Sequence, residues 1–137
     1  MECPLCKIKY KESSRIILED NYSLACIIKE PITESHLLII PKRHVNSMEN
    51  LSPKESKSIL SMLEKISDKL KKIFKTKGCL TLMNHNELKS QEHIHFHVIA
   101  TNTGLRHIIS TYFKKPFKQE LSEEELETLA INIKKHL

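Results

Sequence analysis

The sequence has no tryptophan, only two glycines among its 137 residues, and an aromatic content of 5%. It also lacks long apolar runs, because stretches such as residues 37–41 are far shorter than the roughly 20 residues of a membrane-spanning helix. Residues 1–6 contain neither the basic region nor the apolar segment of a signal peptide. Four cysteines are too few for a disulfide scaffold in a chain of this length. We therefore expect a soluble, cytoplasmic protein with no membrane partner.

An excess of basic residues gives the chain a net charge of +5, with many of its lysines in residues 54–77. Such a stretch can attract phosphates or nucleic acid. The sequence shows no arginine cluster and no interleaved aromatic residues, which nucleic-acid-binding surfaces use to stack bases. We interpret the lysines as the solvated face of a helix and expect no nucleic acid partner.

The pattern of apolar residues predicts an antiparallel α+β fold. Two short β-rich runs on either side of Asp20-Asn21 indicate a hairpin, since this pair is typical of a turn. Ser52 and Glu55 form a capping box at the start of a long helix, which we expect to end at Gly78. The predicted strands are residues 15–18, 24–28, 36–40, 79–83 and 93–100, and the predicted helices are residues 52–78 and 122–136.

These elements are consistent with one domain over residues 1–137. Because the links between strands are short and few helices separate them, we expect an antiparallel sheet of about five strands rather than repeated βαβ units. A long central helix and a C-terminal helix complete the predicted fold. The motifs described below lie within residues 3–100, and residues 101–137 form a C-terminal extension.

The most informative segment is His93-Ile94-His95-Phe96-His97, in which histidines and apolar residues alternate. Side chains of a strand point to opposite faces in turn, so the three imidazoles should share one face. Burying three imidazoles without partners is unfavourable, and we expect this face to line a cleft, to bind a metal or to face water. Two chemistries fit: a zinc or iron ion held by the histidines, or an imidazole nucleophile that attacks phosphorus. The spacing within the strand does not separate them.

Three other segments extend this pattern. Together with the histidine strand, the segment from His36 to Val45 and the residue Asn84 after an apolar strand resemble the histidine triad (HIT) superfamily of nucleotide hydrolases and transferases. Residues 3–8 resemble the C-x-x-C-x-I opening of the zinc-containing branch of that superfamily. The resemblance runs from residue 3 to about residue 100 and implies a HIT-like α+β fold. It also implies cleavage of nucleoside phosphoramidates or dinucleoside polyphosphates at the α-phosphate, through a nucleotidyl-histidine intermediate.

The resemblance implies a role for each matching residue. His95 matches the attacking histidine, His97 a donor to the phosphoryl oxygens, His36 a buried supporting histidine and Asn84 a contact near the phosphate. His93, the first histidine of the triad, belongs both to this group and to the implied structural zinc site, whose ligands would be Cys3, Cys6, His44 and His93. No metal is needed for the chemical step. The implied partners are a purine nucleotide, with an AMP or GMP moiety, and a second copy of the chain in a homodimer.

The sequence also departs from the family pattern. Ile28, followed by Lys29, stands where the family commonly carries an aspartate for the ribose hydroxyls, and the loop from Asn84 to His93 has no glycine. In that loop, Ser90 matches a residue near the leaving group, and Lys89 and Gln91 are candidate phosphate contacts. Two alternatives stay open, the first because of these departures and the second because of the histidine strand itself. One is a nucleotide-binding module with weak turnover, and the other is a metal-dependent hydrolase that uses the histidine strand.

Overall fold

The computed structural model describes residues 2–89, 91–113 and 121–137. The chain divides into two compact units, Met1–Gly104 and Leu105–Leu137, and each is described here by itself. The prediction of one domain over the whole chain stays a prediction.

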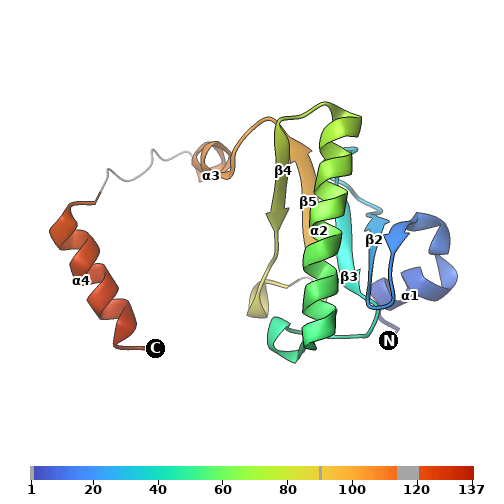
Figure 1. Ribbon diagram of the computed structural model, residues 1–137, viewed down its shortest axis with the longest axis horizontal. Coiled ribbons are helices and arrows are strands. Elements are labelled where there is room, and N and C mark those ends of the chain that lie inside the picture. The colour runs from blue at the N-terminus through green and yellow to red at the C-terminus, as the bar shows by residue number, and fades with distance from the viewer. Residues whose placement is uncertain (1, 90, 114–120) are drawn as a thin grey trace. The chain divides into compact units, whose positions relative to one another are not determined.

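The first unit is built on an antiparallel sheet of five strands in the order β1-β2-β3-β5-β4 (Figure 1). The predicted α+β fold and its sheet are thereby confirmed. The predicted hairpin joins β1 and β2, and the Asp20 carboxylate accepts hydrogen bonds from the backbone N–H groups of Tyr22 and Ser23 in its turn. The strands are β1 (Ile16–Glu19), β2 (Ser23–Ile27), β3 (Leu37–Pro41), β4 (Gly78–Leu82) and β5 (Phe96–Thr101).

The long helix α2 (Pro53–Phe74) lies across one face of this sheet (Figure 1). Its predicted capping box is present, because the Ser52 hydroxyl accepts from the Glu55 backbone and the Glu55 carboxylate accepts from the Ser52 backbone. Its buried stripe, which includes Ile59, Met62, Ile66 and Leu70, packs against alternate residues of the strands.

The predicted end of this helix at Gly78 is wrong. The helix ends at Phe74, and Lys75 takes the left-handed conformation (φ 54°) that a glycine adopts more easily. Gly78 instead begins β4. A residue other than glycine can take this backbone conformation singly at a modest energetic cost.

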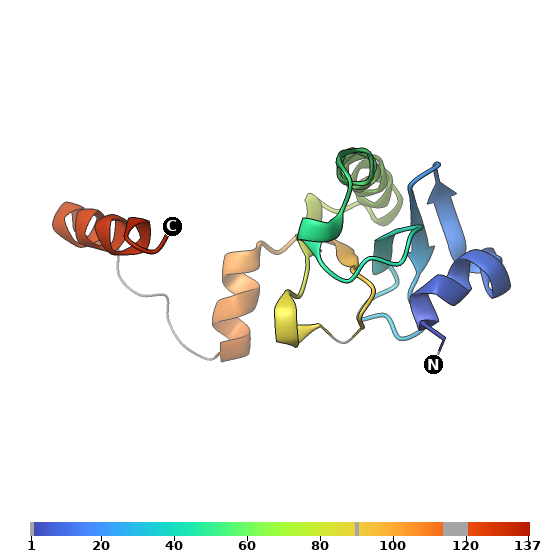
Figure 2. The ribbon, with the colours of Figure 1, turned by 90° about the horizontal axis from the view of Figure 1, so that it is seen from below.

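A shorter helix, α1 (Pro4–Lys11), covers the opposite face of the sheet, over β2 and β3 (Figure 2). Its buried residues Leu5 and Ile8 pack against Leu38 and Ile40 of β3, whereas the intervening Ile39 packs on the α2 side. Leu38 pairs with His97 of β5, and directly paired residues of antiparallel strands point to the same face. The His97 side chain therefore lies on the α1 side of the sheet.

The fifth strand begins three residues later than predicted. His93 and His95 precede it, because the Ile94 N–H donates to the Val45 carbonyl, 2.7 Å away, and the ladder with β3 begins only at Phe96. The alternation inside the strand is as expected: Phe96 and Val98 pack on the α2 side.

The described residues of the second unit include two helices, α3 (Leu105–Phe113) and α4 (Glu123–Lys134). The predicted capping box of Ser122 and Glu125 starts α4, which lies within the predicted range 122–136. The part of the first unit that the structure describes also has short 3-10 turns at Ser13–Arg15, Met48–Asn50 and Asn86–Leu88. None of the helices in the described parts of the chain combines the length and the apolar character needed to cross a bilayer.

Candidate active site and metal-ligand cluster

A cavity of about 430 Å³ lies on the α1 side of the sheet. His95, His97 and Gln91 line one part of it, and Leu5 and Leu38 add apolar surface. Its charged lining comes from residues far apart in the sequence: Lys7, Glu12, Arg15, Lys29 and Glu30. The volume and mixed lining are those of a small-molecule site.

The hydrogen bonds around His95 define its tautomer. The residue is 6% exposed, and its ring Nδ1 lies 2.9 Å from the backbone oxygen of His93. A carbonyl oxygen can only accept, so Nδ1 carries the proton and donates it. In the neutral ring, Nε2 then has a free lone pair, which makes it a base, a ligand or a nucleophile.

A chain of hydrogen bonds defines the tautomer of His97 in the same way. The Ile32 backbone N–H donates to His36 Nδ1 at 3.1 Å, so neutral His36 carries its proton on Nε2. That Nε2–H donates to His97 Nδ1 at 2.8 Å, which leaves the proton of His97 on Nε2. His97 thus has an N–H donor beside the lone pair of His95, with the two ring centroids 5.1 Å apart.

Burial keeps these supporting rings neutral at physiological pH. It lowers the pKa of His36, and it lowers the pKa of His97 to about 4, with further contributions from the charges of His95 and His36. A neutral His97 donates from one nitrogen only, so the chain of hydrogen bonds from Ile32 decides which nitrogen that is.

A second cluster gathers the four predicted metal ligands. Sγ of Cys6 lies 3.4 Å from Nδ1 of His44 and 3.4 Å from Nδ1 of His93, and Sγ of Cys3 lies 3.6 Å from the same His93 nitrogen. Tetrahedral coordination with metal–sulfur and metal–nitrogen bonds of about 2.3 and 2.0–2.1 Å places sulfur and nitrogen ligands about 3.6 Å apart. All four ligand atoms lie within 4.8 Å of one another, so this group could hold a metal ion.

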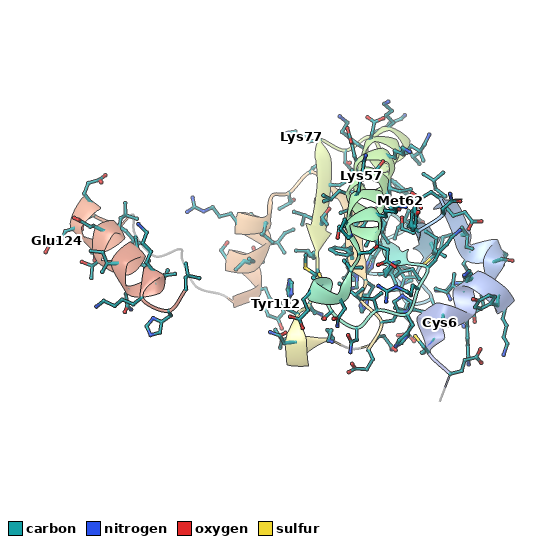
Figure 3. The ribbon with its side chains drawn as sticks, turned by 60° about the horizontal axis from the view of Figure 1, so that its bottom comes forward. Cys6, Lys57, Met62, Lys77, Tyr112 and Glu124 are labelled. Atoms are coloured by element: carbon teal, nitrogen blue, oxygen red, sulfur yellow. The ribbon has the colours of Figure 1, made fainter. Side chains whose placement is uncertain are left out.

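Local structure brings these ligands together. Cys3 is the N-cap of α1 and Cys6 projects from its first turn (Figure 3), while His44 follows β3 and His93 precedes β5. His93 Nε2 donates to the Pro41 carbonyl at 2.9 Å, which leaves Nδ1 free to bind a metal.

The charge states of the cluster also bear on metal binding. Burial lowers the pKa of His93 to about 4, so its ring is neutral, as a ligand must be. Burial, and then the neighbouring Cys3, raises the pKa of the Cys6 thiol to about 11. A bound cation reverses this effect, because it stabilises the thiolate.

The structure separates the remaining predicted residues. Gln91 lines the cavity with His95 and His97. The Lys89 Nζ instead donates to the Asn46 carbonyl at 2.6 Å, and Lys89 lines another pocket with Asn46. Asn84 is exposed, two residues beyond Leu82, the strand partner of His97. Ser90 lies outside the described residues. The substrate roles of these residues stay predictions.

The charged part of the cavity was not predicted from the sequence. Glu12 and Arg15 follow α1, a helix absent from the predicted elements, and Lys29 follows β2. A signal for α1 exists, because Pro4 stands directly after Cys3 at the first helical position, where proline is favoured.

Comparisons with known proteins agree with this architecture. A family model described as HIT domain matches residues 9–104. An uncharacterized HIT-like protein of Borreliella burgdorferi is 32% identical over 96% of this chain and 96% of its own length. A Saccharomyces cerevisiae protein named adenosine 5′-monophosphoramidase is 35% identical over 71% of this chain and 61% of its own length. The crystal structure of a HIT family member from Bacillus subtilis has a TM-score of 0.74 at 25% identity and covers 100% of this chain and 98% of its own.

Proposed function

Because the chain belongs to the HIT domain family, we propose that it is a nucleotide hydrolase or nucleotidyl transferase that uses His95 as its nucleophile. Its substrate is a nucleoside phosphoramidate or a dinucleoside polyphosphate, attacked at the α-phosphate. The name of the yeast relative supports the phosphoramidate, and the cavity beside His95 is large enough for a nucleotide.

The observation that carries this proposal is the pair of opposite tautomers in the cavity. His95 has its lone pair on Nε2, and His97 has its proton on Nε2. A lone pair next to an N–H donor suits attack at phosphorus, because the donor stabilises the negative charge that develops on the phosphoryl oxygens.

The reaction proceeds in two steps. His95 Nε2 forms a bond to the α-phosphorus while the bond from phosphorus to the leaving group breaks, and the leaving group takes a proton from water. In the second step a water molecule adds to the phosphorus and gives up one proton to solvent, which replaces the proton taken in the first step; the Nε2–phosphorus bond breaks, and the nucleoside monophosphate is released with the imidazole regenerated. His97 Nε2–H donates to a phosphoryl oxygen in both steps.

The test is the release of AMP from adenosine 5′-phosphoramidate and from diadenosine polyphosphates by purified protein. We expect His95→Ala to abolish release and to retain binding of AMP, and we expect wild type quenched in alkali, where a histidine–phosphorus bond is stable, to carry one AMP on His95, detected by mass spectrometry. Release that persists in His95→Ala contradicts the assignment of the nucleophile. Binding of AMP without any release by the wild type supports a binding module instead, and release that stops on chelation supports the metal-dependent hydrolase.

We further propose that Cys3, Cys6, His44 and His93 hold a structural zinc ion. Mixed thiolate and imidazole ligands suit zinc, and four protein ligands leave no coordination position for a substrate. Such an ion, when bound, would link the start of α1 to the loops that precede β5 and follow β3. One zinc per chain by elemental analysis of purified protein, and none in Cys6→Ser, is the expected result.

The dimer and the purine preference remain proposals that come from the family resemblance, and the cytoplasmic location remains a proposal that comes from the composition of the sequence. A sedimentation mass of two chains is the result expected for the dimer.

A further inference from the structure

A cluster of three charged residues lies in the wall of the cavity that holds His95 and His97. Glu12 receives a hydrogen bond from Lys29 Nζ on Oε1, at 2.8 Å, and another from the Arg15 guanidinium on Oε2. Arg15 is itself fixed, since its Nε donates to the Ile27 carbonyl at 2.9 Å. The Glu12 side chain, 25% exposed, is therefore held by Arg15, three residues further along the chain, and by Lys29, which follows β2.

This carboxylate is ionised and still able to accept. The hydrogen bonds from Lys29 and then Arg15 lower the pKa of Glu12. An ionised carboxylate offers about four lone-pair positions, of which these two partners take one each. A hydroxyl-bearing ligand in the cavity thus finds an oriented acceptor.

A nucleotide whose α-phosphorus lies at His95 brings such hydroxyls into the same cavity. Its sugar carries a vicinal diol, and each hydroxyl needs an acceptor once it leaves water. The described lining contains two carboxylates, Glu12 and Glu30. Among the described ion pairs, those of Glu12 with Arg15 and Lys29 fix the position of its carboxylate, and none involves Glu30.

We propose that Glu12 binds the sugar of the substrate, accepting hydrogen bonds from the 2′- and 3′-hydroxyls and thereby selecting ribonucleotides over 2′-deoxynucleotides. This rests on the function proposed above, and it assigns the sugar contact to the segment that follows α1. It is compatible with Ile28, which also lines the cavity and has no hydrogen-bonding side chain.

The charges favour a neutral diol over a further anionic group. Lys29 and Arg15 are already paired with Glu12, so a phosphate on the sugar would meet the carboxylate as well as the two cations. A diol needs only the free lone pairs of the carboxylate and leaves both ion pairs intact.

The experiment compares adenosine 5′-phosphoramidate with its 2′-deoxy analogue in wild type, Glu12→Gln and the matched control Glu30→Gln. We expect wild type to prefer the ribonucleotide about 10- to 100-fold in kcat/KM, the effect of a hydrogen bond to a charged group. In Glu12→Gln we expect that preference to fall to within about threefold, with turnover of the deoxy substrate close to that of wild type. Glu30→Gln should keep the wild-type preference. Calorimetric affinities for AMP and 2′-deoxy-AMP should change in the same direction.

The outcomes separate the two proposals. If neither substrate yields AMP in a reaction that needs His95, the proposed function fails, and the binding measurements alone then decide the role of Glu12. If AMP is released but wild type does not distinguish the sugars, or Glu12→Gln keeps the preference, Glu12 does not bind the sugar. Faster turnover of a substrate with a 2′- or 3′-phosphate would show that the cations bind the sugar substituent instead. Intact turnover of the deoxy substrate in Glu12→Gln shows that the variant is folded.

Discussion

The hydrogen bond between His36 and His97 predicts a loss of activity from a residue that does not line the cavity. We expect His36→Leu to lower kcat, because His97 Nδ1 loses its donor and the ring is then free to carry its proton on Nδ1. That tautomer presents a lone pair, not an N–H, to the phosphoryl oxygen. One neutral hydrogen bond is worth about 1 kcal/mol, or about fivefold in the ratio of the two tautomers. Complete loss of a transition-state donor costs about 10²–10³-fold. A fivefold change in that ratio lowers the productive fraction by at most about fivefold, so we expect kcat to fall about two- to fivefold in His36→Leu and at least about 100-fold in His97→Leu.

The stability of His36→Leu should change little. His36 is 3% exposed and leucine suits such a site, while Ile32, whose N–H loses its acceptor, is 77% exposed and can bind water. We expect a change within about 1 kcal/mol in urea unfolding. His36→Gln, whose amide can donate to His97, should recover part of the rate. His107→Leu, at an exposed position of α3, should leave both quantities unchanged.

The assay that separates a tautomer effect from a general disturbance is nitrogen NMR of the histidine rings. In wild type, Nδ1 of His97 should be unprotonated and Nε2 protonated, and in His36→Leu both forms should be populated. A kcat within twofold of wild type, with the His97 tautomer unchanged, would refute the reasoning.

Three further predictions concern the scaffold. Cys3→Ser should not bind the proposed zinc ion, and adding zinc should raise the melting temperature of apo wild type but not of the apo variant, while the two apo proteins melt together. The hydrogen bond from Arg43 is the main reason that the pKa of Glu55 is lowered to about 2. The ionised Glu55 therefore stabilises the folded state at pH values above the pKa that it has in the unfolded chain, and this contribution is lost as the pH falls through about 2. Glu55→Gln should cost about 1–2 kcal/mol in urea unfolding at pH 7 and little at pH 2. Because burial lowers the pKa of His97 to about 4, the unfolded chain binds more protons between about pH 6.5 and 4. The free energy of unfolding should therefore fall as pH is lowered through this window, and fall less in His97→Gln.

Local signals in the sequence are strong enough to predict most of the sheet and both capped helices. The capping boxes at Ser52 and Ser122 involve residues three positions apart, so the sequence contains the whole interaction. The end of α2 was missed because Lys75 takes the left-handed backbone conformation that usually marks a glycine. The prediction therefore placed the end at the nearest glycine, Gly78. Helix α1 was missed because it is short and mostly polar, and its two buried residues depend on the sheet for their packing.

The parts of the candidate site that lie in local sequence motifs were predicted, and the part that depends on tertiary contacts was not. The triad and the ligands of the metal cluster lie in compact motifs, and the pairing of β3 with β5 then brings His36 beside His97. The cluster of Glu12, Arg15 and Lys29 has no such motif. Lys29 reaches Glu12 only because the hairpin folds β2 back along β1, and that contact depends on tertiary structure.

The late start of β5 connects the two centres through His93. The Ile94 N–H donates to the Val45 carbonyl, so the backbone oxygen of His93, in the same trans peptide group, points the opposite way. That oxygen accepts the Nδ1–H of His95, while the His93 ring lies against Cys3 and Cys6. One residue thus fixes the tautomer of the proposed nucleophile with its backbone and joins the metal-ligand cluster with its side chain. The alternating sequence is therefore compatible with two different roles for its histidines, since only His97 of the three lies in the regular strand.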